Sequence, residues 1–141
     1  MKRKYFLVVF FLILAMFLVG CSGVGPNPSI TDETQISDLI SKLCVAISAK
    51  DFDLAKSYCY PGSSAYLMIE QFETMVDPYS MNDVTIWAYP SIYSIVVTGN
   101  EATVVAEINI QIWIQGVEQI VDTQPGTTIL IKSGGEWYFY Y

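Results

Sequence analysis

The stretch "IYSIVVTGNEATVVAEINIQIWIQ", residues 92–115, decides the fold of this chain. After the turn residues Gly99-Asn100, small or apolar side chains occupy every second position: Ala102, Val104, Ala106, Ile108, Ile110, Ile112 and Ile114. Most positions between them are polar: Thr103, Glu107, Asn109, Gln111 and Gln115. This period of two predicts an antiparallel hairpin with one dry face and one wet face. A shift of one residue would turn the isoleucines into water, so the pattern also fixes the register.

Further strand-like segments flank this hairpin on both sides. Before it, "DVTIWAY" (83–89) alternates between apolar and more polar positions. After it, we predict strands in "VEQIVDTQ" (117–124) and in "TTILIKSGGEWYFYY" (127–141), the latter with a turn at its two glycines. The strand that follows Asn100 is over a dozen residues long, so we expect it to bend or to carry a bulge.

The segment before the strands has the longer period of amphipathic helices. We predict three of them, within residues 31–51, 54–59 and 63–78, the first capped by Thr31 and the last ended by Pro78. Helices followed by strands indicate the α+β class, and the length of residues 31–141 corresponds to one domain.

Three motifs, in this order, resemble those of NTF2-like (cystatin-like) domains. They are "AISAKDFDLAKSYC" at a helix turn, "TGNEATVVAEI" at a hairpin and "LIKSGGEWYFYY" at the final hairpin. The resemblance implies an α+β cone in which three N-terminal helices pack on a curved antiparallel sheet, often around a pocket. It also implies a range of roles, from ketosteroid isomerases, dehydratases and polyketide cyclases to binding or assembly modules.

The first twenty residues have the layout of a removable secretory signal. Lys2, Arg3 and Lys4 precede an apolar run from Tyr5 to Val19. As a helix this run would span about 22 Å, which is short for a bilayer core of roughly 30 Å. The tetrapeptide "LVGC" that ends at Cys21 resembles the lipobox of bacterial lipoproteins.

That resemblance implies cleavage before Cys21 and lipid attachment at this cysteine. Residues 22–30, "SGVGPNPSI", are then a flexible tether, since Gly, Pro, Asn and Ser resist regular structure. Two or more acyl chains hold a protein firmly on a membrane. We therefore expect an extracytoplasmic protein on the cell membrane, or on the outer membrane of a two-membrane host, because Ser22 does not resemble an inner-membrane retention signal. An uncleaved anchor and a soluble secreted protein remain the alternatives.

The charge balance after cleavage excludes several classes of function. The cleaved chain would have fourteen acidic residues and four lysines, with no arginine and no histidine. Its net charge would be about −10. Nucleic-acid binding needs a basic surface, and triads need a histidine base, so neither is expected. Two cysteines alone cannot close a zinc site, and no metal or cofactor is expected. The acidic chain repels anionic headgroups, so lipid rather than charge must hold it at the membrane.

Aromatic side chains are the best candidates for contact with a ligand or partner. We single out residues in the predicted strands: Trp87, Tyr89, Trp113, Tyr138 and Tyr140. Trp113 interrupts the polar face of the long strand. Exposed aromatic surface marks interaction sites, here for a small apolar ligand, a peptide, an envelope protein or a second copy bound through the sheet face. The alternative is ordinary core and cross-strand packing.

Cys44 and Cys59 lie at equal distances from the turn at Asp51–Asp53. Two helices folded back about that turn would bring both cysteines to one level, and exported proteins can form disulfides. We expect a disulfide worth about 3 kcal/mol in the chain-entropy model. Two reduced, buried cysteines are the alternative.

Two functions of different classes follow. The favoured one is a non-catalytic binding or interaction module on a membrane-anchored lipoprotein. The other is a pocket enzyme of the ketosteroid-isomerase or dehydratase type, which needs a carboxylate base in an apolar cavity. Candidates for the catalytic groups can be named by residue type only. They are Asp51, Asp53, Asp83 and Tyr89. The first two flank a helix turn, where capping is the simpler role, and we assign no catalytic residue.

Overall fold

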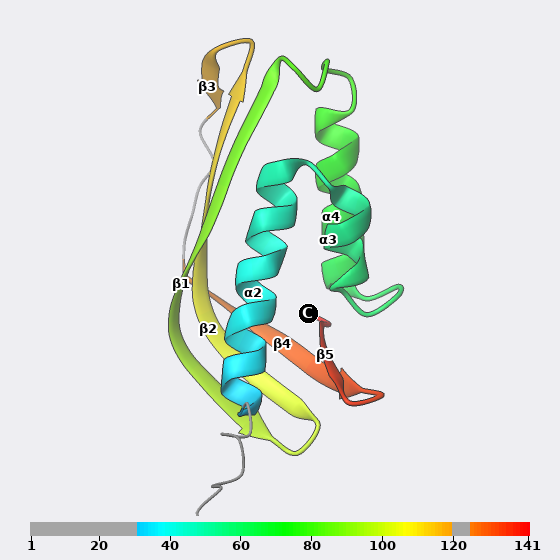
Figure 1. Ribbon diagram of the computed structural model, residues 1–141, viewed down its shortest axis with the longest axis vertical. Helices are drawn as coiled ribbons and strands as arrows, with labels where there is room; N and C mark the ends of the chain where they lie inside the picture. Colours follow the sequence, from blue (N-terminus) through cyan, green and yellow to red (C-terminus); the bar gives the residue numbers. More distant parts are fainter. Residues whose placement is uncertain (1–30, 120–124) are drawn as a thin grey trace, which may run out of the picture. The chain divides into compact units, whose positions relative to one another are not determined.

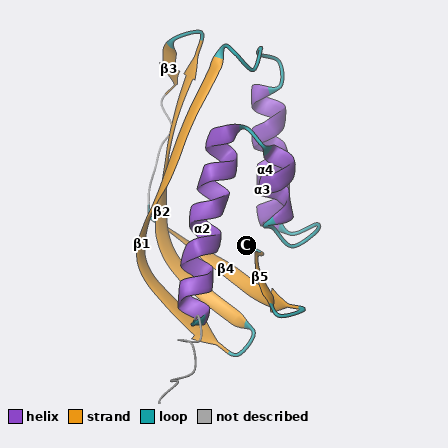
Figure 2. Ribbon diagram, viewed as in Figure 1, coloured by secondary structure: helices purple, strands orange, loops and turns teal. Residues whose placement is uncertain are grey.

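Three helices lie on one side of a curled antiparallel sheet (Figures 1 and 2). The computed structural model describes residues 31–119 and 125–141. The predicted signal segment, the candidate lipidation site Cys21 and the predicted tether fall outside the described residues. No helix within the described part is long and apolar enough to cross a membrane.

The helices begin and end at residues that satisfy their free backbone groups. They are α2 (Asp32–Ala49), α3 (Phe52–Ser57) and α4 (Ser64–Val76). Thr31, Asp51 and Ser63 accept hydrogen bonds from backbone N–H groups in the first turn of the respective helix, the usual role of an N-cap residue. The three predicted helices are confirmed, with α3 beginning two residues earlier than its pattern suggests.

Among the described residues the sheet contains five strands. They are β1 (Val84–Thr98), β2 (Glu101–Ile114), β3 (Val117–Gln119), β4 (Gly126–Ser133) and β5 (Glu136–Phe139). The order is β1-β2-β4-β5, and β3 pairs with the end of β2. All these pairs are antiparallel. The predicted α+β class and curved antiparallel sheet are confirmed.

Two details of the strands differ from the sequence patterns. The pattern separates residues 83–89 from the hairpin, whereas β1 runs without interruption through Pro90. Proline is tolerated there because β1 is an edge strand and needs no N–H donor toward solvent. The bulge expected in the long second strand lies on its partner: the register shifts between Ile92 and Ser94 of β1. Of the predicted strand 117–124, Val117–Gln119 is a strand, and residues 120–124 are outside the described part.

The free edge of β1 is capped by the C-terminal end of α2. The Ser48 hydroxyl accepts a hydrogen bond from Ala88 N at 2.8 Å and donates one to Ala88 O at 3.4 Å. The Lys50 ammonium donates to Met81 O and to Val84 O. These contacts and Pro90 occupy or remove polar groups that would otherwise invite another strand to pair.

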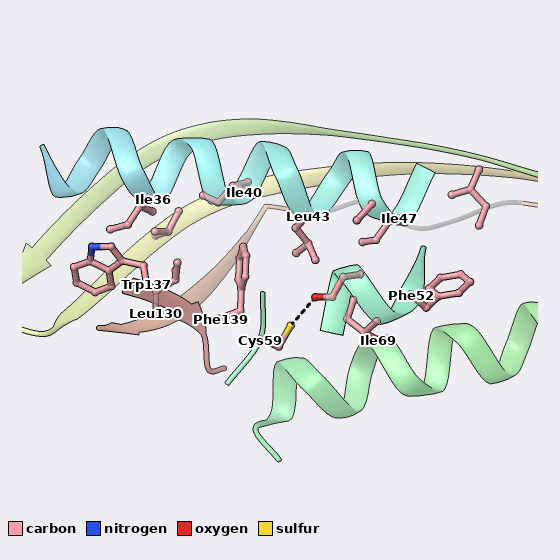
Figure 3. Packing of buried hydrophobic residues seen from close by; sticks show 14 of the residues in the cluster. Ile36, Ile40, Leu43, Ile47, Phe52, Cys59, Ile69, Leu130, Trp137 and Phe139 are labelled. Carbon is pink, nitrogen blue, oxygen red and sulfur yellow. Dashed lines mark hydrogen bonds between the residues drawn. The ribbon is translucent and has the colours of Figure 1, made fainter. Parts of the chain in front are cut away.

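The core forms between α2 and the dry face of the sheet (Figure 3). Ile36, Ile40 and Leu43 of α2 are buried there. Their partners in the sheet include a fully buried set: Ala102, Val104, Ile112 and Leu130. The predicted dry face of β2 is therefore its core face.

Asp32 ties the start of α2 to the last hairpin. One carboxylate oxygen, Oδ1, accepts a hydrogen bond from Lys132 Nζ at 2.6 Å and another from Trp137 Nε1 at 3.0 Å. The hydrogen bond from Lys132, followed by that from Trp137, holds the pKa of Asp32 below its ordinary value. The charged carboxylate is therefore the form that the fold stabilises.

We expect Asp32→Asn to lower the free energy of unfolding at neutral pH. The folded pKa of Asp32 is depressed, so its stabilising effect is present above the unfolded pKa of about 3.9 and is lost as pH falls through the folded pKa. The difference between wild type and variant should therefore shrink below about pH 4. Urea unfolding across this pH range measures it.

Asp38→Asn is the matched control, because Asp38 is exposed on the same helix and has no ion pair with another described residue. Equal pH dependence in the two variants would contradict the role given to Asp32.

Candidate functional site

The outer face of the β1–β2 hairpin carries a pair of tryptophans. Trp87 is 60% exposed, and its indole meets that of Trp113 edge to face, with ring centroids 5.9 Å apart and planes at 65°. In the register, Trp87 lies opposite Gln111 and Thr85 opposite Trp113. The two indoles are thus diagonal cross-strand neighbours, a separation that aromatic side chains can bridge.

An open hollow of about 750 Å³ surrounds this pair. The two indoles line it together with polar residues from the start of β1 and the end of β2: Asn82, Asp83, Thr85, Gln111 and Gln115. Gly116 completes the lining at the turn into β3. The hollow is therefore a mixed aromatic and polar surface on a rigid sheet.

The turn at Gln115-Gly116 shapes one end of the hollow. Both residues have positive φ, 53° and 77°, as a two-residue hairpin turn matched to the strand twist requires. Gln115 N donates a hydrogen bond to Asp83 O at 2.7 Å, which ties the turn to the entry of β1. Asn82 and Asp83 are held beside Gln115 in this way.

The polar side chains of the hollow are free to meet a ligand. Within residues 31–119 and 125–141, no side-chain hydrogen bond or ion pair engages Asn82, Asp83, Thr85, Gln111 or Gln115. Their donors and acceptors face water beside two indoles. Such a combination of apolar surface and a few polar groups is typical of small-molecule sites.

The five aromatic candidates divide between two places. Trp87, Tyr89 and Trp113 share the outer face of β1 and β2, although Tyr89, at 49% exposure, does not line the hollow. Tyr138 and Tyr140 lie at the C-terminal end, where both contact Tyr60 edge to face. The Tyr138 hydroxyl donates to Glu136, and this hydrogen bond raises the pKa of the phenol.

A second hollow, of about 500 Å³, lies beside Tyr60 and Tyr138. Its charged groups already engage one another: Lys56 Nζ lies 3.0 Å from Asp53 and 2.9 Å from Glu73. This hollow therefore offers a ligand fewer unpaired groups than the surface around the tryptophans.

The carboxylates considered for catalysis are all exposed. Asp51 caps α3 by accepting a hydrogen bond from Leu54 N at 3.0 Å, and Asp53 pairs with Lys56. Asp83 lies in the outer hollow. The buried polar side chain among the described residues is that of Ser63, which is bonded to Tyr66 N and Phe139 O. Within the described part, no carboxylate is buried in the apolar core and no group of His, Cys, Asp and Glu could hold a metal.

Cys44 and Cys59 are both buried, with unbonded sulfurs in the structure, and a disulfide between them stays a prediction from the sequence. Cys59 follows α3, and its sulfur donates to Ala55 O at 3.7 Å (Figure 3). Its backbone forms a bridge with Phe139, so the last strand fixes its position as well as the helix turn. Burial raises the pKa of each thiol to about 11.

The sequence singled out the tryptophans but not the amides beside them. Gln111 and Gln115 lie two residues before and after Trp113, so the period of two already places all three on the wet face, although it marks neither amide as a contact residue. Asn82 joins them only through the tertiary contact between the turn and β1.

Comparison with solved structures identifies the fold. An NTF2-like protein with a cystatin-like fold from Novosphingobium aromaticivorans is 12% identical, with a TM-score of 0.59 and 77% of each chain covered. A Streptomyces avermitilis protein of the NTF2-like family, described as a proposed dehydratase, is 14% identical, with a TM-score of 0.54 and coverage of 77% of this chain and 92% of that one.

A Mycobacterium tuberculosis protein of unknown function is 15% identical with a TM-score of 0.61. The match covers 76% of this chain and 66% of that one, so this chain spans about two thirds of that protein's length. No family model and no curated protein matches the sequence. At these identities the likeness shows the NTF2-like, cystatin-like α+β cone and nothing further about activity.

We expect Cys44 and Cys59 to react very slowly with a thiol reagent at pH 8 in the folded protein. Their thiolate fraction is small because burial raises each pKa to about 11, and only the thiolate is a good nucleophile. The full chain, exported and then denatured without reductant, should show both Cys44 and Cys59 as thiols. Finding none would establish the disulfide expected from the sequence.

Proposed function

We propose that this chain is a bacterial lipoprotein, held outside the cytoplasm by lipid on Cys21, whose NTF2-like domain is a non-catalytic binding module. Its contact surface is the outer hollow around Trp87 and Trp113. The observation that carries this proposal is the exposed indole of Trp87, packed against the half-buried indole of Trp113 among polar side chains that bind no other described residue. An aromatic pair of this size left to solvent is a common mark of a binding surface.

The packing of the core supports an external site. The concave side of the sheet is packed by the apolar cluster from α2, β2 and β4 (Figure 3). The competing enzyme hypothesis needs a carboxylate base inside an apolar cavity. Asp51, Asp53 and Asp83 are all on the surface, which favours binding over isomerase-type chemistry.

The proposed attachment to a membrane rests on the sequence of the first thirty residues. The charged start, the apolar run and the tetrapeptide ending in Cys21 occur in the order of a lipoprotein leader. The following "SGVGPNPSI" segment supplies a tether of about 28 Å at most for nine residues in an extended conformation. The domain would then face the components of the cell envelope.

Expression of the full chain in a bacterium tests the anchor. The wild type should partition into the detergent phase of a cloud-point extraction and begin at an acylated Cys21. Cys21→Ser should move to the aqueous phase or keep its leader, because no sulfur is left to carry the lipid. Cys44→Ser is the matched control and should partition like wild type. A mature N-terminus at another residue, or a Cys21 without fatty acid, would refute the proposed membrane anchor.

The tryptophan indoles provide an internal test of the contact surface. The chain has three tryptophans, and Trp137 is 4% exposed and bonded to Asp32. Adding solubilised envelope material to ¹⁵N-labelled protein should perturb the indole N–H signals of Trp87 and Trp113 and spare that of Trp137. An unchanged spectrum, or a change confined to Trp137, would count against the outer face as the contact surface.

A further inference from the structure

We propose that the outer hollow binds an uncharged oligosaccharide, with sugar rings against Trp87 and Trp113 and sugar hydroxyls bonded to the surrounding side chains. This inference rests on the proposed function, since it names the ligand class of the same surface. It follows from three properties of the hollow: its indole surfaces, its unpaired amides and its lack of cationic groups.

The indoles match the apolar faces of sugar rings. A pyranose presents a patch of C–H groups on one face, and these carry partial positive charge. The face of an aromatic ring is negative because of its quadrupole, so the two surfaces attract each other and shed water. The indole planes of Trp87 and Trp113 meet at 65°, which gives adjoining rings of a bent glycan chain two differently oriented surfaces.

The polar side chains match sugar hydroxyls. Each hydroxyl both donates and accepts hydrogen bonds, and so do the amides of Asn82, Gln111 and Gln115. The Thr85 hydroxyl and the Asp83 carboxylate add further partners. An apolar ligand would leave these groups desolvated without partners, which costs free energy for each group. A polyhydroxylated ligand replaces the lost water bonds.

The local charge selects a neutral glycan over an acidic one. Among the described residues no lysine lines the hollow, whereas Asp83 lies within it and Glu118 of β3 pairs in register with Trp113. The chain as a whole has seven basic and fourteen acidic residues. The acidic groups of this surface would therefore repel uronic acids, phosphates and sulfates. Such anions bind where basic side chains are present.

The shape of the hollow also fits a short polymer. From Val84 to Trp87 the strand that lines the hollow covers about 10 Å at roughly 3.3 Å per residue. The hollow is open at the surface, so a chain longer than the site can continue beyond both ends. A peptide added as a strand is a poorer occupant, because Ser48, Lys50 and Pro90 already occupy the free edge of β1 between Val84 and Pro90.

The test is a titration of the full-length protein, held in a detergent without a sugar headgroup. The probes are uncharged hexasaccharides of glucose, N-acetylglucosamine, mannose and xylose, and a hexasaccharide of galacturonic acid as the acidic comparison. Binding is followed by the indole N–H signals and by calorimetry. We expect at least one neutral probe to perturb Trp87 and Trp113 saturably while Trp137 stays unchanged, and the acidic probe to do nothing.

Three variants define the contact. Trp87→Ala and Trp113→Ala should each weaken binding about tenfold or more, as central aromatic contacts do. Gln111→Ala removes an amide without touching the indole pair, and it should weaken binding even if a tryptophan variant folds poorly. Tyr141→Ala removes an equally exposed aromatic side chain, 67% exposed, away from the hollow, and it should bind like wild type.

The outcomes separate this inference from the proposed function. If no neutral probe binds at millimolar concentration, or if binding survives all three variants, the glycan assignment is wrong. It is also wrong if the indole signals shift with protein concentration because a second copy covers this face. Should envelope material still perturb Trp87 and Trp113 after the glycan panel fails, the binding module stands with another ligand. If neither perturbs them, both proposals fail.

Discussion

The alternation of apolar and polar side chains along β2 is the constraint on which the rest of the molecule depends. Successive side chains of a strand point to opposite faces, so Val104 and Ile112 enter the core while Gln111 and Trp113 face outward. Each large aliphatic side chain contributes about 1.5–3 kcal/mol when fully buried. A shift by one residue would expose all of them at once, so the register of β2 against both neighbours is strongly determined.

Helix α2 holds the sheet at both of its ends. At its start, Asp32 bonds to Lys132 and Trp137 of the last hairpin. At its end, Ser48 and Lys50 bond to the backbone of β1 and of the segment before it. Between these ties the helix buries its apolar side against the concave face. The sheet is thereby held curled, and its outer face is left to water.

The candidate site depends on this arrangement of helix and sheet as well as on the residues that line it. Because the core occupies the concave side, the indoles of Trp87 and Trp113 meet outside, on strands that the core already holds in register. The turn at Gln115-Gly116 then brings Asn82 and Asp83 beside them through one backbone hydrogen bond. A surface built on paired strands needs little reordering when a ligand binds, which keeps the entropic cost of binding low.

The sequence by itself determined the order of helices and strands, the turns at Gly99-Asn100 and Gly134-Gly135 and the faces of β2, because these follow from local periodicity and turn chemistry. It also placed Trp113 on the wet face. Only the tertiary structure decided that β1 continues through Pro90, that the bulge lies beside Ile92, and that Tyr138 and Tyr140 stand apart from the tryptophans. The position of Asn82 beside the indoles belongs to the same group. These features depend on which edge of a strand is left unpaired and on contacts between residues far apart in the chain, and no local pattern encodes either.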